Sequence, residues 1–449
     1  MSTGAGAARG VVDSPVTFWY PPRPMRSAET IAIGSELLVG GRLDSNSLFV
    51  AEQLGMLGLD LRFKTVVGDA VADIVAVIRV AAKRADVVVM TGGLGPTVDD
   101  RTRDAVAKVT GRPLRRHPEA LDGMTRRLAA WGRTPSKAQL RQALIPRGAE
   151  VLPNPVGSAP GFALSWKGAW LAALPGVPGE AREMMTTALV PRLRAALGRR
   201  AGRPIVRYVI HTFGRPESEV DAMLAAVRVR PKAVQLGLLA SPNGVSVSLT
   251  APGGPPDRLV TAVRERLGVW AYATGEERME QVVGRLLTDQ GLTMAVAESC
   301  TGGLIGHRLT EVAGSSGYLD RAVVCYANRA KVELLGVPDE LIREHGAVSA
   351  PVAAAMAEGI RLRSGVGVGL SVTGIAGPGG GTDTKPVGLV YIGLSAGPFR
   401  AGTRDRAALN VTKEYRFHGE RSVIKWRASQ AALDLLRRWL INADPFEAP

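Results

Sequence analysis

A regular alternation of apolar stretches and amphipathic helical patterns between residues 29 and 97 constrains the fold most strongly. The expected strands and helices follow in the order 30–33, 44–57, 61–67, 71–84 and 86–91. Strands that alternate with helices at this spacing form a parallel sheet with helices on both faces. Glycine-containing turns follow the expected strands, and ligands of such folds bind beyond the carboxyl ends of the strands. The sequence therefore predicts an α/β domain with a ligand site at these turns.

The length of 449 residues exceeds what one ordinary hydrophobic core supports and indicates about two to four domains. The chain has no run of about 18 apolar residues and no basic N-terminal segment followed by an apolar one. We therefore expect neither a membrane span nor a signal peptide, and we expect a cytoplasmic protein. Cys300 and Cys325 are the only cysteines, which argues against a disulfide framework and offers no metal-ligand spacing.

The formal net charge of +15 favours anionic partners, either nucleic acid or phosphorylated small molecules. The arginines are scattered along the chain, and few aromatic residues lie among them. This pattern is more typical of solvated protein surfaces than of a nucleic-acid interface. Phosphorylated metabolites are therefore the favoured partners, and nucleic acid is not expected.

Glu36, Asp69 and Asp100 lie at or just beyond the ends of the first three expected strands. Carboxylates that converge on a glycine-rich turn suit a Mg²⁺-assisted diphosphate site, because the metal bridges carboxylate and phosphate oxygens. The same residues could serve only as turn acids or helix caps, which is a routine role for Asp. Spacing alone leaves both interpretations open.

Five sequence blocks in the first 180 residues occur in an order that carries a family resemblance. They are IGSELL (33–38) with DSN (44–46), TVVGD (65–69), TGGLGPTVDD (91–100), NPVGSAPGF (154–162) and LPGVPGE (174–180). Together these blocks resemble the N-terminal domain of the CinA family. That domain is similar to the molybdopterin-binding fold of molybdenum cofactor biosynthesis proteins, a three-layer α/β architecture.

The resemblance implies a site for a phosphorylated or pyrophosphate-containing ligand in this domain. In some CinA-like proteins the domain hydrolyses ADP-ribose with a divalent metal ion, for which Mg or Co is expected here. Ser35 and Val177 stand where family members usually have Thr or Asp, and Pro, respectively. These departures leave an alternative in which the domain only binds a nucleotide or a pterin. The residues implied for the nucleotide are Gly92, Gly93, Gly95, Thr97 and Asn154, and those implied for the metal are Glu36, Asp69 and Asp100.

Composition divides the chain into four parts. Residues 1–27 are rich in Gly, Ala and Pro and are predicted to form a disordered extension. A basic Gly/Pro linker near 194–204 separates the first domain (28–200) from a middle domain (201–275) with a strand–helix–strand–strand–helix–strand pattern. This α+β pattern resembles the KH-like domain of longer CinA proteins. Its loop reads GRPE at 214–217 in place of the GXXG that clamps RNA, so a spacer or dimerisation role is favoured.

The segment AVAESCTGG (295–303) lies near the start of a C-terminal domain (276–442). An apolar, strand-like run stops at Glu298, and a small hydroxyl-rich turn then leads into a helix-like pattern. Such a turn leaves backbone N–H groups at a helix start, where they can meet an anion or an oxyanion. The turn is therefore a candidate site for chemistry.

Several later blocks accompany this turn and carry a second family resemblance. They are YANRAK (326–331), EHGAVS (344–349), TGIAGPGGGT (373–382), KPVG (385–388) and Arg421. With ESCTGG they resemble the C-terminal domain of the CinA family, which also occurs alone as the nicotinamide mononucleotide deamidase. The resemblance implies an α/β amidohydrolase that converts nicotinamide mononucleotide to nicotinate mononucleotide and ammonia without a cofactor. Ala327 and Arg329 stand where the family usually has Ser and Glu.

Amide hydrolysis requires a nucleophile, a base, donors for the oxyanion and an acid for the departing ammonia. No histidine occurs in the turn motif, the YANRAK motif or the TGIAGPGGGT motif, so Lys331 is the candidate base if burial lowers its pKa. Ser299 is the natural nucleophile and Tyr326 can relay a proton. Cys300 remains open as a rival nucleophile, because thiolates are stronger nucleophiles. The candidates for contacts to the substrate oxyanion and phosphate are Thr301, Gly302, Gly303, Thr373, Gly374 and Arg421.

The expected partners follow from these two resemblances. They are pyridine nucleotides for the C-terminal domain and ADP-ribose for the N-terminal domain. Two larger domains joined by a small middle module also fit a homodimer, although no stretch of the sequence proves one.

Overall fold

The computed structural model describes residues 27–443 except 41, 199–201, 228–232 and 402–403. The chain separates into two compact units, residues 1–206 with 251–254 and residues 207–250 with 255–449. The predicted disordered extension lies outside the described residues, apart from Ser27, which is the first residue of a strand. None of the helices in the described part of the chain combines the length and the apolar character that a membrane span requires.

A six-stranded sheet forms the centre of the first unit, in the order β2-β1-β3-β8-β7-β6. Its strands are β1 (Ser27–Ile33), β2 (Asp60–Val67), β3 (Val87–Thr91), β6 (Glu150–Leu152), β7 (Gly161–Trp166) and β8 (Ala169–Leu174). Strands β2, β1, β3 and β8 are parallel, which confirms the predicted parallel sheet. Strand β7 forms an antiparallel hairpin with β8, which the sequence pattern did not indicate.

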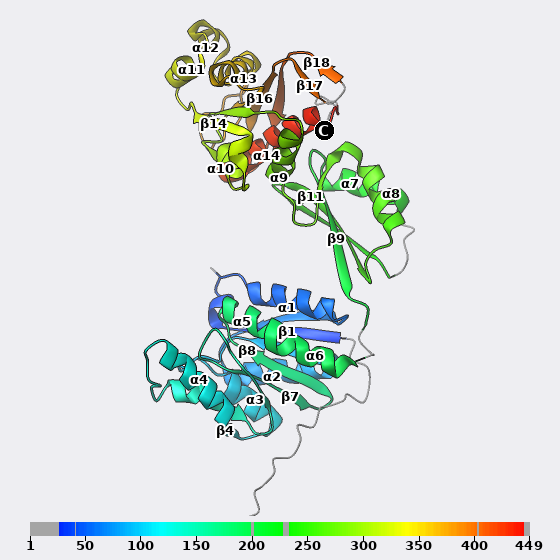
Figure 1. The fold of residues 1–449 in the computed structure, drawn as a ribbon, viewed down its shortest axis with the longest axis vertical. Coiled ribbons are helices and arrows are strands. Elements are labelled where there is room, and N and C mark those ends of the chain that lie inside the picture. The colour runs from blue at the N-terminus through cyan, green and yellow to red at the C-terminus, as the bar shows by residue number, and fades with distance from the viewer. Residues whose placement is uncertain (1–26, 41, 199–201, 228–232, 402–403, 444–449) are drawn as a thin grey trace, which may run out of the picture. The chain divides into compact units, whose positions relative to one another are not determined.

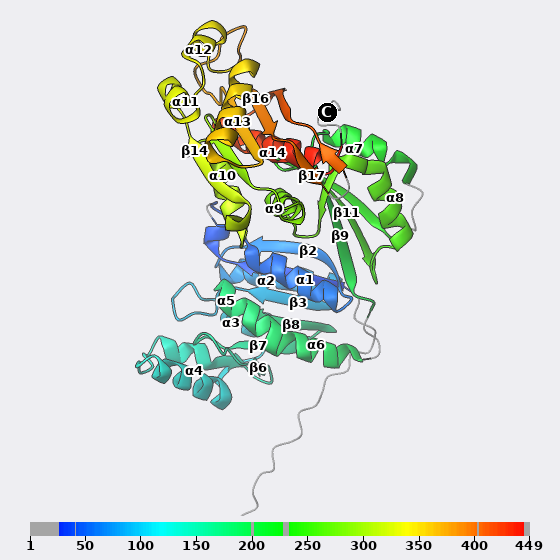
Figure 2. The ribbon, with the colours of Figure 1, turned by 45° about the horizontal axis from the view of Figure 1, so that its top comes forward.

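Helices cover both faces of this sheet, as predicted, and Figure 2 shows the strands β2, β3, β8, β7 and β6 in succession. Val87 and Val89 of β3 face one helical layer, whereas Val88 and Met90 face the other. The first layer contains α1 (Ser45–Met56), α5 (Pro178–Met184) and α6 (Val190–Leu197). The second contains α2 (Val71–Arg84), α3 (Thr102–Thr110) and α4 (Pro118–Ala130), beside the small hairpin of β4 (Leu114–Arg116) and β5 (Leu144–Pro146). The first unit is therefore a three-layer α/β domain.

The middle segment has its own four-stranded sheet, in the order β10-β11-β9-β12. Its elements are β9 (Ile205–Thr212), α7 (Glu217–Met223), β10 (Gln235–Ser241), β11 (Gly244–Pro252), α8 (Asp257–Leu267) and β12 (Ala271–Thr274). This is the strand–helix–strand–strand–helix–strand order that the sequence predicts.

The C-terminal segment contains a five-stranded mixed sheet, in the order β14-β13-β15-β16-β19, of which Figure 1 labels β14 and β16. Its strands are β13 (Met294–Glu298), β14 (Leu319–Val324), β15 (Val368–Gly374), β16 (Leu389–Ala396) and β19 (Leu409–Arg416). Strand β13 pairs in parallel with both β14 and β15, so the carboxyl ends of these three strands lie at one edge of the sheet. Strand β19 was not predicted. It lies at the edge of the sheet and many of its residues are polar, so it lacks the continuous apolar run that marks the buried strands.

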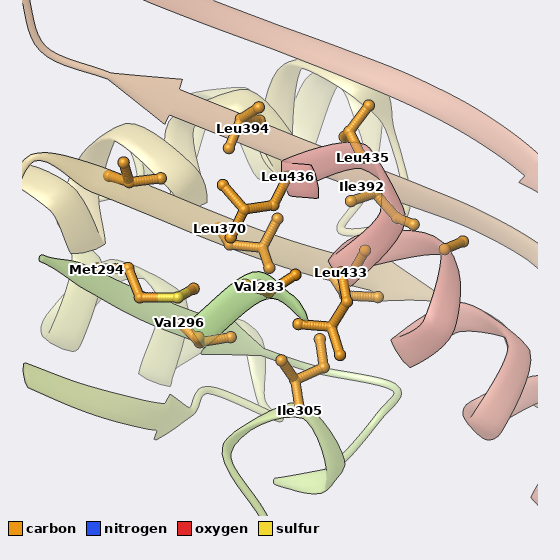
Figure 3. Packing of buried hydrophobic residues seen from close by; sticks show 14 of the residues in the cluster. Val283, Met294, Val296, Ile305, Leu370, Ile392, Leu394, Leu433, Leu435 and Leu436 are labelled. Carbon is orange, nitrogen blue, oxygen red and sulfur yellow. The ribbon is translucent and has the colours of Figure 1, made fainter. Parts of the chain in front are cut away.

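Two helical layers cover this second sheet. One layer contains α9 (Met279–Asp289), α10 (Leu304–Thr310) and α14 (Arg421–Leu440). Figure 3 shows how Val283 of α9 and Leu433 of α14 pack near Val296 and Leu370 of the sheet. The opposite face packs against α11 (Asn328–Leu335), α12 (Asp339–His345) and α13 (Ala350–Ser364). This arrangement places the ends of α10, α11 and α14 around the carboxyl edge of β13.

Candidate active site

The turn after β13 brings Ser299 to the carboxyl edge of the C-terminal sheet. The Ser299 backbone N–H donates to the Val372 carbonyl of β15 at 2.9 Å, which ties the turn to the neighbouring strand. Gly302 and Gly303 have φ angles of 62° and 94°, which are favourable only for glycine and let the chain reverse into α10. Ser299 is buried, with 7% of its surface exposed.

Lys331 of α11 reaches the same point from the other side of the turn. Its Nζ donates to Ser299 Oγ at 3.2 Å and to the carbonyl oxygens of Cys325 and Tyr326 at 3.0 and 3.1 Å. The lysine is 1% exposed, and it forms no ion pair with a carboxylate in the described part of the chain. The structure thus brings together the two residues that the sequence analysis assigned to nucleophile and base.

Burial lowers the pKa of Lys331 below its ordinary value, because a charged ammonium group loses its hydration. In the neutral form, two N–H groups satisfy the two backbone carbonyls and the lone pair remains for the Ser299 hydroxyl. The surroundings of Lys331 therefore suit a proton acceptor.

Cys300 lies next to Ser299 in sequence but belongs to the hydrophobic core. Its side chain is 5% exposed and lies in the cluster that contains Ile305 and Ile424. Burial raises the pKa of the Cys300 thiol to about 12, so the thiolate is scarce near neutral pH. The geometry favours Ser299 over this rival.

Arg421 and Tyr326 form the exposed side of the same site. Arg421 is the first residue of α14, and its Nη2 donates to the Tyr326 hydroxyl at 3.0 Å. Its Nη1 donates to the Gly377 carbonyl at 2.6 Å. Because the Tyr326 oxygen accepts from Arg421, the tyrosine hydroxyl hydrogen remains available to a substrate.

Glu298 makes a contact that the sequence analysis missed. Its fully buried carboxylate accepts hydrogen bonds from Gly303, Ile305 and Gly306 N–H groups at 3.0, 3.1 and 2.8 Å. The start of α10 is therefore capped by the protein's own glutamate. The Gly303 N–H, predicted as a contact for the substrate oxyanion or phosphate, donates to this carboxylate instead. A glutamate at the end of an otherwise apolar strand was the available signal.

The two threonines of the site differ in their partners. Thr373 Oγ1 donates to the Ala347 carbonyl at 2.8 Å, so this hydroxyl supports the loop before α13. Thr301 is fully buried, and its Oγ1 has no hydrogen-bond partner in the described part of the chain. Gly374 allows β15 to approach β16 closely, since a Cβ there would lie 2.7 Å from the Leu389 carbonyl. Thr301 is thus the threonine with an unused hydroxyl.

A separate cleft of about 690 Å³ lies in the first unit, at the carboxyl ends of its parallel strands. Its lining includes most of the residues that the sequence analysis assigned to nucleotide and metal: Gly92, Gly93, Gly95, Thr97, Glu36, Asp69 and Asp100. Asn154 does not line this cleft. Its Nδ2 donates to Ala159 and Glu180, and its Oδ1 accepts from Val156 and Gly157, so the amide supports its own loop.

Two acids of this cleft already have hydrogen-bond partners within the protein. Asp100 accepts from Gly95 N–H, Thr97 N–H and Thr97 Oγ1, each at 2.7 Å. Asp69 accepts from the Ser35 N–H at 2.9 Å. Across the described residues, no group of three or more His, Cys, Asp or Glu side chains is arranged to hold a metal ion. In this structure Asp69 and Asp100 therefore act as acids that stabilise turns, which is one of the two interpretations that the sequence left open.

Arg103 is a further residue of this turn that the sequence analysis missed. Its guanidinium donates to the carbonyl oxygens of Leu94 and Gly95, both at 2.7 Å. Burial lowers the pKa of Arg103 to about 10. Asp100 accepts N–H groups of the glycine-rich turn and Arg103 donates to its carbonyl oxygens, so both side chains stabilise the conformation of the turn.

Comparisons with known protein families match two separate parts of the chain. Residues 29–195 match the family model described as a probable molybdopterin binding domain, and residues 276–440 match the CinA C-terminal domain. The chain is 41% identical to a putative competence-damage inducible protein of Symbiobacterium thermophilum, over 92% of this chain and 99% of that protein. The chain belongs to the CinA family.

Another relative matches over a similar extent, and a solved structure matches a shorter part of the chain. A CinA-like protein of Geobacter sulfurreducens is 42% identical over 92% of this chain and 99% of its own length. The crystal structure of a competence/damage inducible protein from Agrobacterium tumefaciens is 42% identical over 35% of this chain and 93% of its own, with a TM-score of 0.32. Membership of the CinA family confirms the resemblance that the sequence blocks indicated.

Proposed function

We propose that the C-terminal domain hydrolyses the carboxamide of nicotinamide mononucleotide to give nicotinate mononucleotide and ammonia. The observation that carries this proposal is the buried contact between Lys331 Nζ and Ser299 Oγ, at 3.2 Å. Membership of the CinA family supports it by the resemblance of the C-terminal motifs to the deamidase domain.

In the first half-reaction, neutral Lys331 accepts the Ser299 proton while Oγ attacks the carboxamide carbon. The resulting oxyanion needs hydrogen-bond donors, and the exposed Tyr326 hydroxyl is a side chain that can supply one. Lys331 then gives its proton to the amide nitrogen. Ammonia leaves, and Ser299 carries the acyl group as an ester.

In the second half-reaction, Lys331 accepts a proton from water, which attacks the ester carbon. The tetrahedral adduct collapses and the ester bond to Ser299 breaks. Lys331 returns its proton to Ser299 Oγ, so the free enzyme is regenerated and nicotinate mononucleotide is released. No group beyond the chain and water is required for either half-reaction.

The remaining donors of Arg421 suit the substrate phosphate. Arg421 uses one N–H each for Gly377 and Tyr326, and a guanidinium has five N–H groups. The group is exposed at the mouth of the site, where a phosphate can reach it. Charge-assisted hydrogen bonds of this kind orient the nucleotide so that its carboxamide faces Ser299.

Ammonia release from nicotinamide mononucleotide tests the proposal. We expect turnover by the wild-type chain and a loss of about 10³-fold or more in Ser299→Ala. Trapping the ester by acid quench, followed by mass spectrometry of the peptide that contains Ser299, identifies the nucleophile. Absence of wild-type turnover, or full activity of Ser299→Ala, would contradict the proposed function.

For the first unit, we propose that the cleft binds a nucleotide or a pterin as a binding module. The hydrogen bonds that Asp100 makes to Gly95 and Thr97 support this reading over hydrolysis of ADP-ribose, since they use the carboxylate within the turn. Equilibrium titration with ADP-ribose, with and without Mg²⁺ or Co²⁺, tests it. Metal-dependent formation of AMP would favour the hydrolase alternative.

A further inference from the structure

Lys425 lies over the nucleophile-bearing turn, although no sequence block pointed to it. It follows Arg421 by one turn of α14, so the two side chains share a face of the helix. The Lys425 Nζ is 3.4 Å from the position that a Cβ on Gly302 would occupy. Its positive charge also acts on Cys300, the neighbour of Ser299. The Lys425 ammonium group is thus part of the surroundings of the turn.

The Lys425 ammonium group has no hydrogen-bonding or ion-pair partner among the described residues. Its side chain is only half-buried. The Lys331 ammonium group, by contrast, directs its three hydrogen bonds to Ser299 Oγ and to two backbone carbonyl oxygens. A cation that lies near Gly302 of this turn without a counter-ion among the described residues is available to an anionic ligand.

Other groups at this edge of the sheet that could bind an anion already donate hydrogen bonds within the protein. Glu298 occupies the N–H groups of Gly303, Ile305 and Gly306 at the start of α10. Arg421 already donates to Tyr326 and Gly377. A phosphate dianion bound by Arg421 alone would keep part of its charge uncompensated, whereas a second cation one helical turn away compensates it.

We propose that Lys425 binds the substrate phosphate together with Arg421, and so selects a phosphorylated nucleotide over the corresponding nucleoside. This inference rests on the proposed deamidation for its substrate. Lys425 is a specificity-determining residue in this arrangement, since it acts on the phosphate and not on the carboxamide.

Steady-state ammonia release tests the inference with two substrates, nicotinamide mononucleotide and the same nucleoside without phosphate. Lys425→Ala should raise KM for the mononucleotide by about tenfold to a hundredfold and leave kcat within about twofold. Its kcat/KM for the nucleoside should not change, whereas a merely structural role would lower activity on both substrates. Lys425→Arg should recover most of the affinity, because it restores the charge.

Arg427→Ala is the matched control. It removes one positive charge from the same helix, but Arg427 donates to the His418 carbonyl and lines a different hollow with Tyr415 and Phe417. We expect wild-type KM values for this variant. A similar rise in KM in Arg427→Ala would show that general electrostatic attraction, and not a Lys425 contact, explains the effect and would overturn the inference.

Calorimetric titration with inorganic phosphate separates the two proposals. If the wild-type chain releases no ammonia, the proposed function fails, and weaker phosphate binding by Lys425→Ala than by wild type still supports the anion site. Equal phosphate affinity in the two proteins, or no phosphate binding by wild type, overturns the inference. An unchanged KM for the mononucleotide in an active Lys425→Ala enzyme overturns it as well.

Discussion

Lys331 Nζ lies 3.2 Å from Ser299 Oγ, although the two residues are 32 positions apart in the chain. The contact exists because β13 and β14 are parallel neighbours, so that the turn after β13 and the start of α11 after β14 meet at one edge. Burial without a carboxylate partner lowers the pKa of the lysine. The arrangement of the sheet therefore accounts both for the distance between the two atoms and for the lowered pKa of Lys331.

The pH dependence of the reaction should follow Lys331. Because its pKa is lowered by burial, kcat/KM should rise with pH through a single ionisation below 10.5, the ordinary value for lysine, as the neutral amine forms. A rate profile for ammonia release between pH 5 and 10 measures this limb. Lys331→Arg should lose about 10²-fold or more, since its guanidinium stays protonated. A profile flat across this range would contradict the lysine base.

Stability should respond to the same ionisation with a defined sign. The folded chain binds the Lys331 proton less tightly than the unfolded chain, so the free energy of unfolding should rise with pH between the folded and the unfolded pKa. Below the folded pKa, the buried charge costs stability. Lys331→Met removes this contribution, and the difference between its denaturation curves and those of wild type at several pH values measures it. Stability differences independent of pH would argue against a lowered pKa.

Replacing Cys300 should leave catalysis largely intact. With a thiol pKa of about 12, only about 10⁻⁵ of Cys300 is ionised at pH 7. We expect Cys300→Ala to keep kcat within about threefold and to lose about 1 kcal/mol of stability through core packing. Initial rates beside Ser299→Ala, with thermal unfolding of both variants, provide the measurement. Equal inactivation of the two variants would instead favour the thiol.

Glu298 should matter for both the shape and the activity of the turn. Glu298→Gln cannot accept all three N–H groups in its neutral amide form, so we expect a loss of about 1–3 kcal/mol in the free energy of unfolding and a lower kcat. Denaturant unfolding and ammonia release measure the two effects. Glu311→Gln is the control, because Glu311 is an exposed acid at the other end of α10. If the two variants lost stability and activity equally, the claim that the Glu298 carboxylate specifically supports this turn would be contradicted.

Asp100 should act on the turn of the first unit in the absence of any metal. Asp100→Asn weakens the contacts to Gly95 and Thr97, so we expect about 1–2 kcal/mol lower stability and weaker ADP-ribose binding in EDTA as well as in Mg²⁺. Asp99→Asn removes the same charge from the adjacent exposed position and serves as the control. Binding lost only in the presence of metal, with unchanged stability, would instead identify Asp100 as a metal ligand.

Much of the fold follows from local patterns. The helix over Val71–Arg84 and the strands on either side of it are close to the predicted ranges, because apolar periodicity reports which face of an element is buried. Strand β19 and the hairpin of β7 and β8 did not emerge in the same way. Their residues face neighbouring strands, and pairing between distant segments leaves only a weak local pattern.

For the candidate site too, the sequence and the tertiary structure determined different properties. The sequence alone determined which residues could do the chemistry. The hydroxyl-rich turn, the lysine motif and the motifs that carry the family resemblance are each a contiguous stretch of residues. Only the tertiary structure decided how these residues are used. Burial places Cys300 in the core and lowers the pKa of Lys331, Glu298 accepts the Gly303 N–H at the start of α10, and α14 places Lys425 Nζ near Gly302. The physical reason is that pKa values, desolvation and hydrogen-bond partners depend on neighbours that are distant in the chain.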